Sequence, residues 1–384
     1  MRALPRTLRA SLHVLTAALA FASACSDLSA PSSDPQVLPR PAADAPGARR
    51  ITVYTQNLYV GADVDAVIAA LASGDQAAAL DALSHAVATL HRTSFEARAA
   101  AIADEIARVR PDVVGFQEGS KIDVDLTPLG APIVAHEDFL VTLRNALAAR
   151  GLSGYAVADT ITNIQASLLS GLVSLTDYDI MLVNTERVTV GSTFKKNFAE
   201  NDGPFAGIDL IRGFIGAEIT VEGRGYVVVT THTEGTDLTP LVDYHQLHAS
   251  QMQEIVDRVS LLDLPAIVMG DLNDSEVSPM YSVMRDAGFA DAWRTLHPGA
   301  EGNTCCHLSD LSDSGPPAGT FDQRIDYVFA RGFGVVGRDL HGQITRYGVL
   351  KPDQLTGPDG TLWPSDHAGL VATLVAPAAI GAAR

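Results

Sequence analysis

The sequence predicts a layered α/β fold, because segments of helical periodicity alternate with short apolar strands along most of the chain. The chain has 384 residues, and 47% of them are apolar, so a large core can be buried. One buried strand, residues 266–269, runs directly into Gly270, Asp271, Leu272 and Asn273. Side chains two residues apart on extended backbone point the same way, so we expect Asp271 and Asn273 to share a sheet edge. Alone, this pattern is typical of an ordinary turn.

The first 25 residues are typical of an export signal. Arg2, Arg6 and Arg9 precede an apolar run, residues 12–22, that is too short to span a membrane. The run leads to a lipobox-like sequence ending on Cys25; an ordinary secretory signal cleaved nearby is the alternative. We therefore expect a cell-envelope lipoprotein, periplasmic or on the outer membrane, or otherwise a secreted protein.

Residues 26–50 are rich in Pro, Ala, Ser and Asp, and their composition predicts a flexible tether. The formal net charge is -18, and without the three signal arginines 24 basic residues face 45 acidic ones, a charge of -21. Such acidity disfavours indiscriminate binding to nucleic acid, which depends on phosphate neutralisation by Lys and Arg. A focused basic groove remains compatible with it.

Residues 51–57 alternate like a strand and end on Asn57, which by itself would cap the next turn. Residues 63–90 are rich in alanine and predict an inserted pair of helices with no sign of chemistry.

Residues 96–110 predict an amphipathic helix in which Asp104 pairs toward Arg108. Residues 112–118 predict a buried strand that ends on Glu118. Burying a carboxylate there is unfavourable unless a cation or hydrogen bonds compensate.

Strand character returns over residues 178–184, and Asp177 and Asp179 are interpreted as surface or turn residues. Residues 212–219 predict a strand that opens on Arg212, and a hairpin turn follows at residues 223–225.

The next strand, residues 226–231, ends on His232, and a histidine there is more often structural than catalytic. His245 and His248 lie on the following amphipathic helix, where we expect exposed residues rather than metal ligands.

Two more strands complete the domain. The first, residues 324–329, carries Asp326, and the second, residues 368–375, follows Asp366 and His367. Residues 377–384 form a small tail that we expect to be disordered.

Polar side chains therefore stand where five strands begin or end: Asn57, Glu118, His232, Asp271 with Asn273, and Asp366 with His367. Arg212 and Asp326 stand beside the same edges. Oxygen-rich ligands suit Mg²⁺ or Mn²⁺ rather than zinc. Histidines and an arginine beside carboxylates suggest a bound phosphate next to the metal.

Six blocks in order give the sequence a resemblance to the endonuclease/exonuclease/phosphatase superfamily. They are Gln56-Asn57, Gln117-Glu118, Thr231-His232-Thr233, Gly270-Asp271-Leu272-Asn273, Arg324-Ile325-Asp326-Tyr327 and Ser365-Asp366-His367. The resemblance spans residues 51–376, and residues 57–63 resemble an exported bacterial branch. It implies a catalytic domain built as a two-sheet, four-layer α/β/β/α sandwich with the site at one end. Two departures are Thr233-Glu234, where many members have Leu, and the long spacing between Asn57 and Glu118.

The resemblance implies a Mg²⁺ site, with Mn²⁺ or Ca²⁺ as alternatives. Glu118 would bind the metal, Asn57 would lie in the same site, and Asp366 would be a further ligand.

The resemblance also implies catalytic roles. Asp271 would orient and activate water, and Asn273 would bind the transition-state oxygens. His232 and His367 would hold the phosphate, and Asp326 would fix the His367 ring. Arg212 would add a phosphate contact.

The implied function is that of an exported, metal-dependent phosphoric ester hydrolase that uses in-line attack of water on phosphorus. We expect the protein to be a monomer. Nucleic acid, a phospholipid and a small phosphoester remain open as substrates. The alternative class is a catalytically inactive surface lipoprotein that binds a partner.

Cys305 and Cys306 are adjacent in a loop, in a compartment that permits disulfides. Their Cα atoms lie about 3.8 Å apart across a trans peptide, below the usual disulfide range. Two unlinked residues packing the loop are the alternative, but we predict a vicinal disulfide. We expect it to affect substrate handling more than stability.

The lipobox-like sequence gives a first test. If Cys25 carries the lipid anchor, Cys25→Ala should move the protein from the membrane fraction to the soluble fraction, because no other segment would hold it there. Fractionation of the full-length chain in a bacterial host measures this. Membrane association unchanged by the substitution would contradict the anchor.

Overall fold

The computed structural model describes residues 49–201, 203–205, 208–235, 242–313, 321–334 and 340–376. The expected export signal, the tether up to residue 48 and the tail at 377–384 lie outside the described residues. Within those ranges, no helix combines the length and apolarity needed to cross a membrane.

The larger of two main sheets has nine strands in the described part of the chain. From edge to edge they are β14 (His341–Tyr347), β17 (Gly369–Ala376), β1 (Arg49–Asn57), β2 (Val113–Asp125), β5 (Val173–Asn184), β4 (Tyr155–Leu168), β8 (Ile208–Leu210) and β7 (Gly203–Phe205), with β3 (Val134–Asp138) paired to β2.

The second sheet has six strands among the described residues: β12 (Ala290–Asp291), β13 (Asp326–Arg331), β11 (Ala266–Asp271), β10 (Arg224–His232), β9 (Gly213–Val221) and β6 (Val188–Asn197). A small separate ribbon pairs β15 (Leu355–Gly357) with β16 (Gly360–Leu362).

The α-helices in the same ranges are α1 (Val64–Ala72), α2 (Gln76–Thr93), α3 (Phe95–Val109), α4 (Phe139–Ala149), α5 (Tyr244–Ser260), α6 (Pro279–Asp286) and α7 (Ala292–Leu296). Short 3₁₀ turns are η1 (Thr127–Leu129), η2 (Leu169–Gly171) and η3 (Lys351–Asp353).

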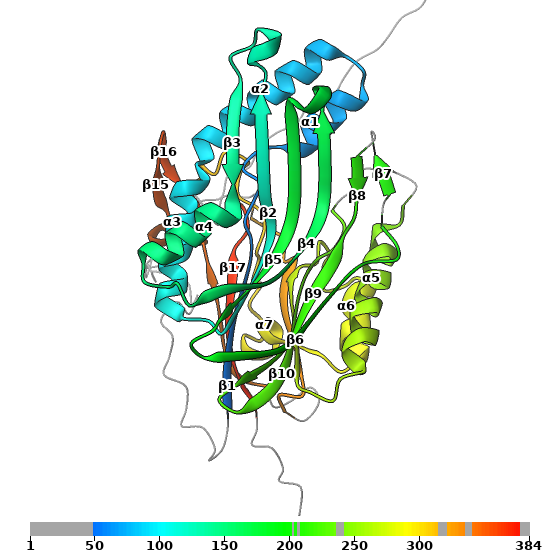
Figure 1. Ribbon diagram of the computed structural model, residues 1–384. Coiled ribbons are helices and arrows are strands. Elements are labelled where there is room, and N and C mark those ends of the chain that lie inside the picture. Colours follow the sequence, from blue (N-terminus) through cyan, green and yellow to red (C-terminus); the bar gives the residue numbers. More distant parts are fainter. Residues whose placement is uncertain are drawn as a thin grey trace, which may run out of the picture. The chain divides into compact units, whose positions relative to one another are not determined.

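The predicted four-layer sandwich is confirmed. One apolar core lies between the sheets, where Ile51 of the larger sheet and Val228 and Ile267 of the smaller one are fully buried. Helices α3 and α4 pack on the outer face of the larger sheet, and α5 and α6 pack on that of the smaller one. Figure 1 shows these two helix pairs on opposite sides of the sheets. Each sheet is covered on both faces, which suits strands that are apolar on both sides.

The predicted inserted helices are α1 and α2, which cover the far end of the larger sheet. One predicted ion pair is wrong. Asp104 pairs with Arg150, the residue that caps the end of α4, at 2.6 Å between carboxylate oxygen and Nε, while Arg108 pairs with Glu105. Asp104 therefore links two helices instead of stabilising its own.

The predicted end of the second strand is also wrong. β2 continues to Asp125 because β3 and β5 go on pairing with it beyond Glu118. Glu118 instead lies in a bulge, where the pairing register with β5 shifts between Phe116 and Gly119 and the Glu118 φ is 56°. A bulge re-aims a side chain without ending the strand.

Strand register aligns three polar residues of the second sheet. β10 and β11 are parallel with His232 opposite Asp271, and β11 and β13 are antiparallel with Asp271 opposite Asp326. Residues opposite each other on paired strands point to the same face, so these three side chains form one row.

Gly270 makes this alignment possible. Its φ is 145°, and a Cβ there would lie 1.9 Å from the Thr231 carbonyl oxygen of the neighbouring strand. Gly223, at the β9–β10 turn, has a φ of 77° but no atom within 4 Å of a Cβ.

We expect Gly270→Ala to lower the free energy of unfolding by about 3 kcal/mol or more, because the backbone must move as well as adopt a strained φ. Gly223→Ala is the matched control and should cost about 1 kcal/mol, from φ alone. Urea unfolding of both variants measures the difference. Equal losses would show that the Thr231 carbonyl does not constrain residue 270.

Candidate functional site

Asp271 lies at the centre of the candidate site. His367 Nδ1 lies 2.9 Å from Asp326 Oδ2 and 3.8 Å from Asp271 Oδ2. Burial opposes protonation of His367, but the charges of Asp326 and Asp271 outweigh it and raise the His367 pKa. Burial, followed by the charge of Asp326, raises the pKa of Asp271 to about 6. Near neutral pH, His367 is therefore an imidazolium that lies between the carboxylates of Asp326 and Asp271.

His232 approaches Asp271 from the other side. Its Nε2 lies 3.5 Å from Asp271 Oδ2, and its Nδ1 accepts a hydrogen bond of 3.0 Å from Arg212 Nη1. A guanidinium can only donate, so Nδ1 is the acceptor and Nε2 carries the proton. Burial, followed by the charge of Arg212, lowers the pKa of His232. A neutral imidazole therefore presents an N–H toward the pocket.

Arg212 itself is held by Glu234, whose Oε1 lies 3.3 Å from its Nε. Glu234 is buried and belongs to the site, although no site role was predicted for it. The available signal was the departure of Thr233-Glu234 from the expected pattern after His232.

Asn57 joins two carboxylates. Its Nδ2 donates to Glu118 Oε1 at 2.9 Å and to Asp271 Oδ2 at 3.1 Å, and its Oδ1 accepts from the Tyr59 N–H. The amide therefore presents its nitrogen to both carboxylates, and the place of Asn57 in a metal site stays a prediction. As placed, it positions the two carboxylates.

Asn273 lies beside Asp271, as the sequence predicted. Its backbone N–H donates to Asp271 Oδ1 at 3.0 Å, and its Nδ2 lies 3.3 Å from the Thr233 carbonyl oxygen. Its φ of 46° turns the chain sharply after β11, so the side chain remains at the edge of the pocket.

Asp177 and Asp179 correct the sequence interpretation. Both are buried within β5 and not on the surface, because this strand begins at Val173, five residues earlier than expected. Asn163 Nδ2 donates to Asp177 at 3.1 Å and to Asp179 at 2.8 Å. Period-two alternation from Asp177 to Asp179 in an apolar segment was the missed signal.

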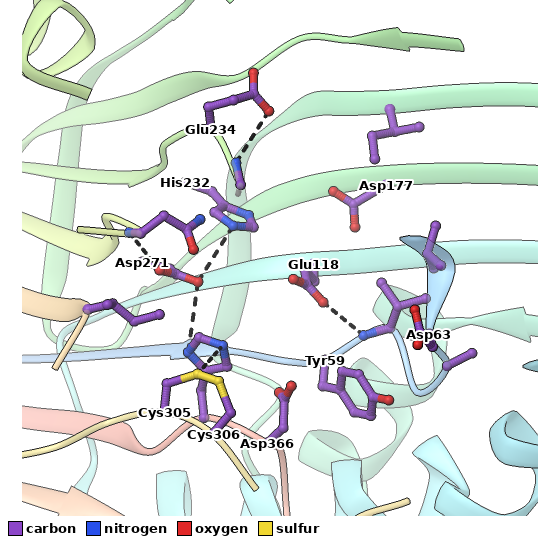
Figure 2. Close-up of a pocket in the computed structure, with 18 of the residues that line it drawn as sticks. Tyr59, Asp63, Glu118, Asp177, His232, Glu234, Asp271, Cys305, Cys306 and Asp366 are labelled. Atoms are coloured by element: carbon purple, nitrogen blue, oxygen red, sulfur yellow. Dashed lines mark hydrogen bonds and ion pairs between the residues drawn. A yellow bond between two sulfur atoms is a disulfide. The ribbon is translucent and has the colours of Figure 1, made fainter. Parts of the chain in front are cut away.

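Carboxylates crowd the opposite part of the pocket. Burial, followed by the charge of Asp366, raises the pKa of Glu118. Burial, followed by the charge of Glu118, raises the pKa of Asp177 to about 7. Glu118 and Asp366 remain partly exposed to the pocket. Figure 2 shows the Glu118, Asp177 and Asp366 side chains around the same opening.

This donor set fits a hard divalent cation. Glu118 and Asp366 supply partly exposed carboxylate oxygens in one pocket, and their mutual repulsion is the kind that a bound cation relieves. Asp271, Asp326 and His367 also bring potential ligand atoms within 4.8 Å of one another. The 2.9 Å contact between His367 and Asp326 accounts for that second cluster without a metal.

Cys305 and Cys306 form the predicted vicinal disulfide. Cys305 is buried, its backbone bridges to Gln323 and His367, and its Sγ lies 3.6 Å from His367 Nε2. The disulfide is therefore part of the pocket wall (Figure 2). Its effect on substrate handling stays a prediction.

His248 is buried and not exposed, contrary to expectation. Its Nδ1 lies 3.2 Å from Asp274, and its Nε2 lies 2.9 Å from the Glu234 carbonyl oxygen. His245, which is largely exposed, contacts the same carboxylate at 2.9 Å. The two histidines thus tie α5 to the turn after Asn273.

A pocket of about 400 Å³ gathers most of the predicted site. Its lining includes seven of the predicted residues: Glu118, Arg212, His232, Asp271, Asn273, Asp366 and His367. The other two predicted residues contact the lining: Asn57 donates a hydrogen bond to Glu118, and Asp326 contacts His367.

Comparisons with known proteins bear on the family and on the fold. The model of the endonuclease/exonuclease/phosphatase family matches residues 57–367. No curated protein matches the sequence. An endonuclease/exonuclease/phosphatase family protein from Bacteroides thetaiotaomicron has a similar structure, with 16% identity, a TM-score of 0.53, and coverage of 86% of this chain and 99% of its own.

Two further solved structures are similar. A mannosyl-6-phosphatase from B. thetaiotaomicron has 16% identity and a TM-score of 0.51, with 84% of this chain and 99% of that one covered. TDP2 from D. rerio, complexed with a single-strand DNA product, has 16% identity and a TM-score of 0.50, with 85% and 98% covered. At these identities the likenesses establish the fold. With the family model matched across most of its length, the chain belongs to the endonuclease/exonuclease/phosphatase family.

Proposed function

We propose that the protein is a phosphoester hydrolase whose pocket activates water for in-line attack on phosphorus. The observation that carries this proposal is the setting of Asp271. One carboxylate faces the N–H of His232, the imidazolium of His367 and the amide of Asn57. A proton acceptor surrounded by donors is what attack on an anionic phosphoryl group requires.

Each group has one role in the proposed reaction. Asp271 accepts the proton of the attacking water, the water oxygen forms a new bond to phosphorus, and the opposite P–O ester bond breaks. The leaving alkoxide takes up a proton from solvent, and Asp271 afterwards returns to solvent the proton that it accepted. His232, His367 and Asn273 donate hydrogen bonds to the phosphoryl oxygens, on which negative charge is redistributed during the reaction. Arg212 acts through His232, since its Nη1 bonds the Nδ1 of that imidazole.

Glu118 and Asp366 would hold a divalent cation, which we propose is Mg²⁺. When bound, the cation supplies positive charge next to the phosphoryl oxygens. Asn57 would keep the Glu118 carboxylate in place through its amide nitrogen.

The similar proteins do not point to one substrate for this chain. The family description covers nucleases and phosphatases, and the similar structures include a sugar phosphatase and an enzyme bound to DNA. Incubating the purified mature protein with DNA, sphingomyelin and a panel of phosphate esters, with and without Mg²⁺, tests the proposal. Hydrolysis of at least one ester supports it. No hydrolysis of any of them would instead favour the binding-only lipoprotein.

We also propose that the protein is exported as an anchored lipoprotein and that it acts as a monomer. The export proposal is supported by the N-terminal sequence and by the disulfide, which suits an oxidising compartment.

Glu118→Gln tests the cation site. We expect a loss of activity of about 100-fold and at least a tenfold rise in the Mg²⁺ concentration for half-maximal rate, because a charged ligand is lost. Rates measured across a Mg²⁺ titration, with chelator as the zero point, give both values. Glu137→Gln is the matched control, since Glu137 lies on β3 outside the pocket. Full activity of Glu118→Gln in chelator would contradict the assignment.

Asp326→Asn and His367→Gln test whether the two residues act as a unit. Each should lower kcat by about 100-fold or more, and the double variant should lose little beyond the worse single one. Stopped assays of the four proteins complete the cycle, and combining Asp326→Asn with Glu137→Gln gives the additive reference. Multiplicative losses for the Asp326 and His367 pair would separate their roles.

A further inference from the structure

The catalytic pocket has two chemically different walls. One carries the carboxylates, histidines and arginine described above. The other is aliphatic and comes from the loop after β1, from α1 and from three strands of the larger sheet: Val60, Ala62, Val64, Ile68, Ile164, Leu175 and Leu210. Leu175 and Asp177 are two residues apart and therefore lie on the same face of β5. The apolar wall thus begins next to the carboxylates.

A second cavity, of about 80 Å³, adjoins this aliphatic wall. It lies between the inserted helices α1 and α2 and the face of the larger sheet that also carries Asp177. Six residues line both spaces: Val60, Ala62, Val64, Ile68, Ile164 and Leu175. The deeper lining is also apolar, with Val67 on α1, Ala86 and Val87 on α2, and Ala166 on β4.

The lining chemistry selects the kind of group that fits. Ser174 is the one polar side chain among the described residues that line this cavity. A nucleobase or a sugar would bury polar atoms there without partners, which is unfavourable. A hydrocarbon chain leaves nothing unpaired and gains free energy with each methylene buried.

The outer end of the cavity is also apolar. Leu168 lines it, and the next residue, Leu169 in η2, is 42% exposed. A chain that follows the aliphatic wall away from the phosphoryl site therefore meets apolar side chains from the catalytic pocket to the surface.

We propose that the substrate is an amphiphilic phosphoester, with an aliphatic chain bound in the cavity beneath α1 and α2. This inference rests on the proposed hydrolase function and assigns a role to the helical insert. An apolar cavity of about 150 Å³ takes up benzene, so about 80 Å³ holds three or four carbons of a chain. Longer chains would continue past Leu169.

A series of alkyl 4-nitrophenyl phosphate diesters, from methyl to octyl and below their critical micelle concentrations, tests the proposal. Release of 4-nitrophenolate gives kcat/KM for each ester. If the protein cleaves only monoesters, alkyl phosphates of the same lengths with a phosphate-release assay replace them. We expect kcat/KM to rise about three- to fourfold per methylene, or about 40-fold from methyl to butyl.

Matched variants on the insert locate the effect. Ala86→Leu fills the cavity and should reduce the methyl-to-butyl gain in kcat/KM to less than about threefold, because less apolar space remains for the chain. Ala88→Leu makes the same change on the exposed side of α2 and should behave like wild type. Val67→Ala enlarges the cavity and should extend the rise in kcat/KM to longer chains. This variant tests the same cavity if Ala86→Leu does not fold.

The outcomes separate this inference from the proposed function. Hydrolysis of the methyl ester with no dependence on chain length would overturn the inference and leave the hydrolase standing. Chain dependence that Ala86→Leu leaves intact would also overturn it. No hydrolysis of any ester would overturn both. Where chain dependence is seen, phosphatidylcholine vesicles identify the source of the chain: cleavage supports a membrane lipid, and no cleavage supports a dispersed amphiphile.

Discussion

Crowding of carboxylates between two sheets is the constraint on which this site depends. Glu118, Asp177, Asp271 and Asp366 line one pocket, and burial raises the pKa of each. Such a group is stable only if donors and cations surround it. Asn57 and the charged His367 meet that need around Asp271, whereas Glu118 and Asp366 face open space that suits a divalent cation. The substrate end of the site follows from the same arrangement, because a phosphate is the anion that bridges a cation and these donors.

The fold holds the charged groups from several directions at once. Register alone places His232, Asp271 and Asp326 in a row, and the bulge in β2 turns Glu118 toward them. Arg98 of α3 joins two of the remaining loops: its buried guanidinium donates to the carbonyls of Tyr59, at 3.0 Å, and Pro364, at 3.4 Å. The loop after Asn57 and the loop before Asp366 therefore share one anchor, so a change in the core beneath them would reach the catalytic pocket.

Much of this organisation could be predicted from the sequence, because strand ends and polar motifs are local signals. The two-sheet sandwich and the gathering of Asp271, His232 and His367 follow from them. What the sequence could not provide depends on pairing between distant strands. Glu118 looked like a strand end because the bulge that turns it is fixed by β5, and Asp177 looked exposed because its burial comes from β2 and β4. The orientation of the Asn57 amide depends on Tyr59 and Glu118 together, which no single segment specifies.

Isotope labelling gives a direct test of whether water attacks phosphorus. The protein would hydrolyse its best 4-nitrophenyl phosphoester in ¹⁸O-enriched water with Mg²⁺ present, and mass spectrometry would locate the label. Because Asp271 is placed to activate water toward phosphorus, we expect one ¹⁸O atom in the phosphate-containing product and none in 4-nitrophenol. Label in the 4-nitrophenol would show attack at carbon and rule out attack of water at phosphorus.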